Sequence, residues 1–217
     1  MELGGINPDL PDSFGSTPLS WAARRGHEGV VKLFLDQKGV NPNGSGIPLS
    51  NSPLSLAALY EHPGIVKMLL ERKDVDPNLA SGFFPITPLA MVVQEGPESI
   101  VKMLLERKDI NPNPTDPRYS HTPLLHAAKY GREGIVEMLL ERNDIRTDIP
   151  DKENQTLLSL ALSRGHHKIA RMISERAGTK SNTADPIIQT SLPPSAQRGK
   201  KRAAETQLSG DRPNKHR

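Results

Sequence analysis

Two nearly identical stretches of the chain decide its fold. Residues 65–78 are IVKMLLERKDVDPN and residues 100–113 are IVKMLLERKDINPN, 35 positions later. They differ only at Val75 against Ile110 and at Asp76 against Asn111. Self-similarity at a fixed period is typical of repeat architectures. The chain is therefore predicted to be a linear array of one structural unit.

A second motif shows where each unit begins. Thr-Pro-Leu or Ser-Pro-Leu starts at positions 17, 52, 87 and 122, and Thr-Leu-Leu starts at 156, which predicts about five units of 35 residues. The Thr or Ser hydroxyl can cap a helix, and proline suits the first helical turn. A turn, a second and more apolar helix, and a loop complete each unit. Neither helix is long enough to be stable alone, so the units must stack on one another.

The turn between the two helices has its own signal. Gly26, Gly96, Gly131 and Gly165 stand there and tolerate the left-handed closing conformation, while Glu61 takes this place in the second unit. The second helix has apolar residues on more than one side, as expected of an element between neighbours. In the third unit, Leu104 and Leu105 are expected to be buried between repeats.

The unit resembles the ankyrin repeat. TPLSWAARRGHEGVVKLFL, from Thr17, is similar to the family signature T-P-L-H-x-A followed by two helices. The resemblance implies an all-α helix-turn-helix solenoid with finger loops between units. The aspartate and glycine that precede Thr-Pro in the family are present as Asp12 and Gly15 in the first unit, and the last unit keeps Asp151. The middle loops differ, so irregular fingers are expected there.

The ends of the chain depart from the repeat. Residues 1–15 resemble part of a preceding repeat and its finger, the array is expected over residues 16–178, and residues 179–217 are expected to be a disordered tail. The tail has eight Lys or Arg and three Asp or Glu, so the net charge of +3 is a property of the tail. Its basic residues resemble a bipartite nuclear-localisation signal: Arg198, Lys200, Lys201, Arg202, Arg212, Lys215 and Arg217. Non-specific contact with polyanions and a purely solubilising tail are the alternatives.

The composition argues against several classes of protein. The chain has no cysteine, which excludes disulfides and thiolate metal sites. It shows no secretory signal and no apolar run of membrane-spanning length, so we expect a cytoplasmic or nuclear monomer. No nucleophile elbow, phosphate-binding loop or HExxH motif is present, so we expect no enzyme activity, no cofactor and no metal. His126 is predicted to be a partly buried, hydrogen-bonded histidine.

The aromatic residues indicate a partner-binding face. The chain has eight Phe, Tyr and Trp residues, and four of them precede a Thr-Pro motif. Proteins of the ankyrin family generally bind partners through the fingers and the exposed end of the first helix. Carried over by position, the candidates in this chain are Phe14, Arg24, Arg25, Leu49, Tyr60, Phe83, Phe84, Ile86, Tyr119, His121 and Tyr130. The alternative is that the irregular loops fold these side chains onto the stack.

Three functional hypotheses follow. The first is a non-enzymatic scaffold that binds a protein partner through the fingers and first helices. The second is a nuclear adaptor or transcription-associated regulator, in which the basic tail directs import and is the only part expected to contact nucleic acid. The third is a recognition region that belongs to a larger signalling protein, because the array starts within a repeat.

Overall fold

The array is a stack of helix pairs. The computed structural model describes residues 7–46 and 50–180, and these residues form ten helices. The first helix of each unit is α1 (Pro18–Arg25), α3 (Pro53–Leu59), α5 (Pro88–Glu95), α7 (Pro123–Lys129) or α9 (Leu157–Ser163). The second helix is α2 (Glu28–Leu35), α4 (Pro63–Leu70), α6 (Glu98–Glu106), α8 (Glu133–Leu140) or α10 (His167–Lys180).

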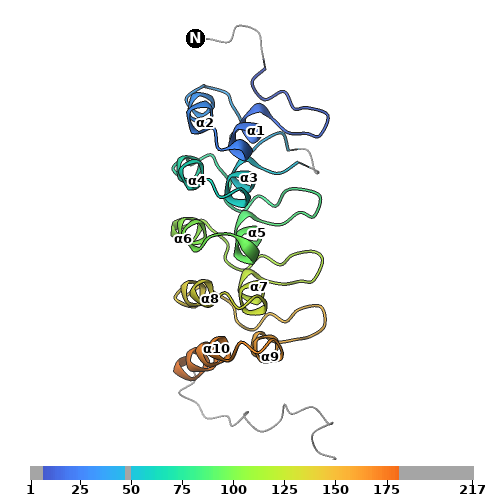
Figure 1. Ribbon diagram of the computed structural model, residues 1–217, viewed down its shortest axis with the longest axis vertical. Coiled ribbons are helices and arrows are strands. Elements are labelled where there is room, and N and C mark those ends of the chain that lie inside the picture. Colours follow the sequence, from blue (N-terminus) through green and yellow to red (C-terminus); the bar gives the residue numbers. More distant parts are fainter. Residues whose placement is uncertain (1–6, 47–49, 181–217) are drawn as a thin grey trace, which may run out of the picture. The chain divides into compact units, whose positions relative to one another are not determined.

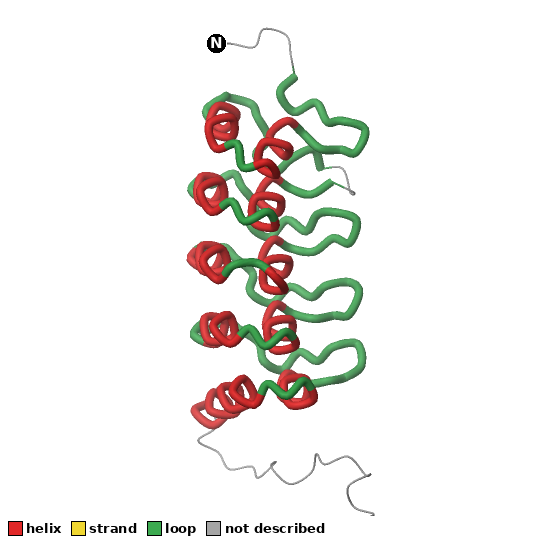
Figure 2. The backbone as a smooth tube through the Cα atoms, in the orientation of Figure 1, coloured by secondary structure: helices red, strands yellow, loops and turns green. Residues whose placement is uncertain are grey.

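The two kinds of helix form two columns. The odd-numbered helices stack in one column and the even-numbered helices in the other (Figure 1). The fingers, which are the loops before each first helix, project from the side of the first helices (Figure 2). Among the described residues, the only β-bridge joins Ser81 to Ile86 in the third finger. The all-α, five-unit array with irregular fingers is therefore confirmed.

The last helix extends slightly beyond the predicted end of the array. Helix α10 continues to Lys180, past residue 178, where we expected the array to end. The first six residues and the tail beyond Lys180 lie outside the described residues, and so do the predictions made for them. No helix in the described ranges is both long and apolar enough to cross a membrane.

Each first helix begins as the sequence predicts. The side chains of Thr17, Ser52, Thr87, Thr122 and Thr156 each accept a hydrogen bond from the backbone N–H three residues later. In the first four units proline occupies the first helical position, where it has no donor to leave unsatisfied. The caps fix the point at which every finger joins its helix.

The turn after the first helix follows the prediction with one exception. Gly26, Gly131 and Gly165 have φ of 74°, 70° and 77°, and Glu61 adopts the same left-handed conformation with φ of 58°. Gly96 instead has φ of −75° and ψ of 171°, so the expectation of a left-handed residue is wrong there. Pro97 follows Gly96, and a residue before proline is pushed towards extended backbone.

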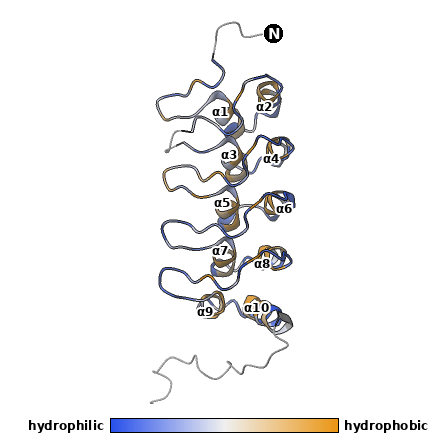
Figure 3. Cartoon of the chain, turned by 180° about the vertical axis from the view of Figure 1, so that it is seen from behind, coloured by the Kyte–Doolittle hydropathy of each residue, from blue (hydrophilic) through white to orange (hydrophobic). Residues whose placement is uncertain are grey.

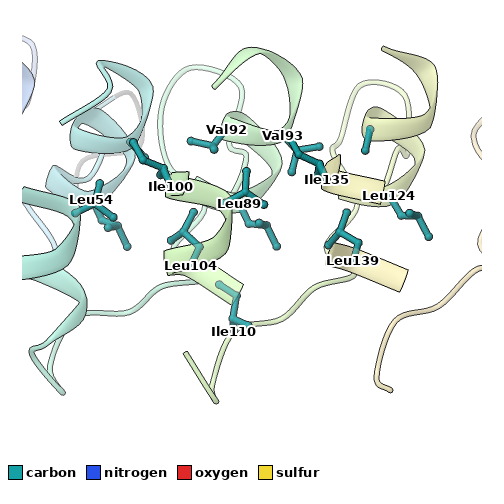
Figure 4. Close-up of a cluster of buried hydrophobic side chains, with 14 of the residues drawn as sticks. Leu54, Leu89, Val92, Val93, Ile100, Leu104, Ile110, Leu124, Ile135 and Leu139 are labelled. Carbon is teal, nitrogen blue, oxygen red and sulfur yellow. The ribbon is translucent and has the colours of Figure 1, made fainter. Parts of the chain in front are cut away.

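A continuous apolar core joins the units. Leu89, Ile100 and Leu104 of the third unit are fully buried and lie close to Leu54 and Leu139 of its neighbours (Figure 4). Hydrophobic residues are concentrated in the helices (Figure 3). Leu104 is buried as predicted, whereas Leu105 is only partly buried and packs against the core from outside. No single pair of helices could bury this much apolar surface, which is why the array needs its repeats.

The recurring RKD and PN residues link adjacent units. Arg107 pairs with Asp109 at 2.7 Å and also donates to the backbone oxygen of Leu70 in the preceding unit at 2.6 Å. Asn78 donates to the backbone oxygen of Asp109, in the following unit. The same arrangement recurs with Arg72 on Leu35, Arg142 on Leu105, Asn43 on Asp74 and Asn113 on Asp144. These contacts explain why residues 65–78 and 100–113 are almost the same.

Candidate functional site

Exposed aromatic side chains from two fingers meet around one cation. Phe83 and Phe84 of the third finger contact each other edge to face, with ring centroids 4.9 Å apart. The guanidinium of Arg118, on the fourth finger, lies 5.8 Å from the ring centroid of Phe84 and 4.9 Å from that of Tyr119. Cations over aromatic faces are held by the ring quadrupole. Arg118 therefore joins neighbouring fingers into one surface.

A second cation extends this surface onto a helix. Lys129, at the end of α7, places its ammonium 5.0 Å from the ring centroid of Tyr119 and 5.7 Å from that of Tyr130. The four rings remain 42–72% exposed. We call this surface the basic-aromatic patch, and its members are Phe83, Phe84, Arg118, Tyr119, Lys129 and Tyr130.

A smaller cluster of the same kind lies on the first two units. Arg24 lies 5.3 Å from the ring centroid of Trp21 and 5.0 Å from that of Tyr60, and Arg25 lies 5.8 Å from that of Trp21. Phe14, 77% exposed, lines the same shallow cleft as Arg24 and Tyr60. The predicted partner-facing residues thus include two clusters of rings and cations, one on the first two units and one on the third and fourth.

Three predicted residues do not belong to either group. Ile86 is partly buried and lines a cleft with Leu59 and Met91, between α3 and α5. Leu49 lies outside the described residues. His121 is only 4% exposed, so the expectation that it faces a partner is wrong. Its backbone N–H donates to Asp116, which turns the side chain inwards just before the cap at Thr122.

Four ionisable side chains are buried together beneath the basic-aromatic patch. Asp116 and His121 come from the fourth finger, His126 from α7 and Asp151 from the fifth finger, and each is 3–7% exposed. Nε2 of His126 lies 3.3 Å from Oδ2 of Asp116, and Nε2 of His121 lies 3.5 Å from Oδ2 of Asp151. The His121 and His126 rings meet edge to face, with centroids 4.9 Å apart. We call these four residues the buried histidine cluster.

Burial decides the charge state of the two histidines. Desolvation, reinforced by the neighbouring His121, lowers the pKa of His126 to about 4, although Asp116 favours the protonated form. Desolvation and Lys129 also lower the pKa of His121. Burial disfavours ionisation of Asp116, but backbone hydrogen bonds from Tyr119 and His121 outweigh it, so the pKa of Asp116 is lowered. Both imidazoles are therefore neutral at pH 7 and lie beside an ionised carboxylate.

This cluster was not predicted from the sequence, because the fourth finger is one residue longer between its aspartate and its cap than the first and last fingers. Asp12 and Asp151 precede their cap residue by five positions, whereas Asp116 precedes Thr122 by six. Asp116 nevertheless closes its finger as Asp12 does, since its carboxylate accepts backbone hydrogen bonds from within the loop. Ser120 adopts a left-handed conformation, with φ of 56°, in this longer loop. His126 is buried more deeply than predicted, at 3% exposed, and its Nε2 lies 3.3 Å from Oδ2 of Asp116.

Comparison with known proteins agrees with this architecture. A family model described as ankyrin repeats (3 copies) matches two stretches of the chain, residues 2–81 and 84–185. The comparison with individual curated proteins finds no match to the chain. Ankyrin repeats are generally protein–protein interaction modules, and the family is typically non-enzymatic. The repeat, the stacked helix pairs and the family model together show that this chain belongs to the ankyrin-repeat family.

Proposed function

We propose that the protein is a non-enzymatic scaffold that binds a partner protein through the basic-aromatic patch. The observation that supports this most is the joint contact of Arg118 and Lys129 with three exposed rings, on two fingers and just after α7. Contiguous exposed apolar surface on a protein usually marks a site of interaction. Aromatic residues and arginine also dominate the binding energy of interfaces.

The chemistry of the patch indicates the chemistry of its partner. Two cations among four rings favour a segment that combines carboxylates with apolar side chains. The carboxylates would pair with Arg118 and Lys129, and the apolar groups would cover Phe83 and Phe84. The contacts between cations and rings hold these side chains in place before binding, so less conformational entropy is lost when a partner arrives.

The experiment compares partner binding with folding in the same variants. The full chain is immobilised, captured proteins are identified by mass spectrometry, and the affinity of the best candidate is measured by calorimetry. Phe84→Ala and Tyr119→Ala should each weaken binding by roughly thirtyfold or more, which corresponds to about 2 kcal/mol. Both variants should keep the circular dichroism spectrum of the wild type, because the two rings lie outside the core.

Two controls separate the patch from other exposed side chains. Leu33 is 66% exposed on α2, in the other column of helices, so Leu33→Ala should bind as the wild type does. Arg24→Ala, in the smaller cluster, should change the affinity by less than about 1 kcal/mol. If Phe84→Ala and Tyr119→Ala bind normally, or if they unfold the array, the proposed surface does not exist.

We also propose that the basic tail directs nuclear import, as the second hypothesis requires. The support is the sequence alone: Arg198, Lys200, Lys201 and Arg202 form one cluster, and Arg212, Lys215 and Arg217 form a second.

A further inference from the structure

We propose that Asp116, His121 and His126 bind one Zn²⁺ ion, and that Asp151 orients His121 as a ligand. The three ligand side chains come from the fourth finger and α7, which are adjacent in the fold. This inference is independent of the proposed scaffold function.

The first argument is the set of unpaired nitrogens in the buried histidine cluster. Nδ1 of His126 and Nδ1 of His121 are buried and have no hydrogen-bond partner among the described residues, and Nε2 of His126 has only its 3.3 Å contact with Oδ2 of Asp116. A buried polar atom without a partner costs about 1–3 kcal/mol, so native proteins rarely leave two of them together. A metal ion among these rings would satisfy one nitrogen of each histidine.

The second argument is the spacing of the donor atoms. One donor atom from each of Asp116, His121 and His126 lies within 4.8 Å of the other two. Nε2 of His126 and Oδ2 of Asp116 are 3.3 Å apart. Tetrahedral Zn²⁺ with bonds of about 2.0–2.1 Å holds its ligand atoms roughly 3.4 Å apart. The His126–Asp116 pair already has this separation, and the donor atom of His121 lies within 4.8 Å of both.

The third argument is the character of the donors. Two imidazoles and one carboxylate, with no sulfur, form a ligand set that zinc accepts. Asp116 is already held in place, because its carboxylate accepts hydrogen bonds from the backbone of Arg118, Tyr119 and His121. Nε2 of His121 faces Asp151, which leaves Nδ1 for the metal. A carboxylate behind a ligating histidine is the usual way in which proteins fix the ring and raise its basicity.

The site also has a route to solvent. His121 and Asp151 line a small surface cleft together with Tyr119, Lys129 and Lys152. The cleft therefore brings solvent to the His121 side of the cluster. Occupation would also fix the rings above it, since Tyr119 stacks on His121 with centroids 5.5 Å apart and Tyr130 stacks on His126 at 6.2 Å.

The first unit shows what a purely structural pairing at this position looks like. Trp21 occupies the helix position of His126, and its Nε1 donates to Oδ2 of Asp12 at 2.8 Å. His126 and Asp116 are equivalent to that pair, but their contact is longer, at 3.3 Å. The fourth unit thus keeps the finger aspartate and places a side chain that can ligate a metal ion at the position of the tryptophan.

The test uses the full chain without an affinity tag. After treatment with a chelator and dialysis, ZnCl₂ is titrated in while bound zinc per chain and Tm are measured. We expect one zinc per chain and a rise in Tm of roughly 5 °C or more when free zinc exceeds Kd about a hundredfold. Co²⁺ in place of zinc should give the visible absorption of a four-coordinate ion.

The key variant takes its residue from the repeat itself. Leucine stands at the position of His126 in the second and fifth units, as Leu56 and Leu160. His126→Leu should therefore fold, with Tm at least equal to that of the zinc-free wild type, and should lose both the bound zinc and the zinc-dependent rise in Tm. His27→Ala and His167→Ala remove exposed histidines and should keep one zinc per chain.

Several results would overturn the proposal. These are a wild-type chain that binds no zinc, a His126→Leu chain that binds as much as the wild type, and loss of zinc in the exposed-histidine variants. If His126→Leu fails to fold, imidazole NMR signals of the wild type decide the question. Zinc must then shift the signals of His121 and His126 and leave those of His27 and His167 in place; the reverse pattern contradicts the site.

Discussion

Nδ2 of Asn78 donates a hydrogen bond to the backbone oxygen of Asp109 at 2.7 Å, across 31 residues of sequence. The same side chain accepts from the backbone N–H of Asn111 at 2.7 Å through its Oδ1. One amide thus satisfies a donor and an acceptor of the following unit. The stack is therefore held by polar links at its loop edge as well as by its apolar core.

Removing this link should weaken the array. Asn78→Ala should lower the free energy of unfolding by about 1–2 kcal/mol, because two backbone groups of the next unit lose their partners. Asn143, exposed and with neither of these contacts, provides a control in which Asn143→Ala changes the stability by less than about 0.5 kcal/mol. Urea denaturation followed by circular dichroism measures both. If Asn78→Ala and Asn143→Ala change the free energy of unfolding equally, the side-chain amide of Asn78 does not stabilise the array.

The apolar core contributes more to the free energy of unfolding than the Asn78 link does. Leu104→Ala should cost about 2–5 kcal/mol, the usual range when a large buried side chain is truncated. Its neighbour Leu105 is only partly buried, so Leu105→Ala should cost clearly less. The loss should broaden or shift unfolding of the whole array, because each unit depends on its neighbours. A thermal melt of Leu104→Ala that coincides with that of the wild type would contradict the stacked core.

One turn offers a stabilising change. Glu61 has φ of 58°, a conformation that glycine adopts without a steric penalty. Glu61→Gly should raise the free energy of unfolding by about 0.5–1 kcal/mol, since relief of the left-handed strain exceeds the added entropy of the unfolded chain. Glu61→Ala removes the same carboxylate but keeps Cβ, so it should give no gain. A gain in both variants would assign the effect to charge instead of backbone conformation.

Acid should destabilise the metal-free chain through His126. Its pKa is about 4 in the folded chain, against an ordinary value of 6.5, so the unfolded chain takes up the proton first. Stability is therefore complete above about pH 6.5 and falls as the pH drops towards 4, by about 3 kcal/mol in total. The groups that face the two histidines are Asp116, Lys129 and Asp151. The lowered pKa of Asp116 adds a further loss of stability that begins at about pH 5 and continues below this window.

Urea denaturation at a series of pH values, with a chelator present, measures this loss. His126→Leu lacks the titrating group and should be much less sensitive between pH 6.5 and 4. If the variant and the wild type lose the same stability over this interval, His126 is not the group responsible.

The tail proposal can be tested outside the array. A fluorescent reporter fused to residues 197–217 should concentrate in nuclei, because basic clusters of this kind are recognised for import. Replacement of Lys200, Lys201 and Arg202 by alanine in the same reporter should abolish the accumulation. An even distribution of both reporters through the cell would remove the nuclear hypothesis.

The sequence by itself determined the repeat, the residue at which each unit begins and its pair of helices. Those features depend on residues close together in the chain: the hydroxyl of Thr17 caps its own helix, and Gly26 closes the turn that follows. Repetition also allowed burial at Leu104 to be predicted, since equivalent positions recur in every unit. The prediction of a left-handed turn residue failed at Gly96, because the following Pro97 pushes its backbone to an extended conformation.

Only the tertiary structure decided which side chains meet between units. Arg118 reaches Phe84 across two fingers, and His121 turns inwards to His126 instead of outwards to a partner. Both arrangements depend on the path of an irregular loop that is one residue longer than its counterparts in the first and last units. Asp116, six residues before Thr122, gave no local signal of its role. Side-chain direction in such a loop is set by hydrogen bonds formed only when the neighbouring units are stacked.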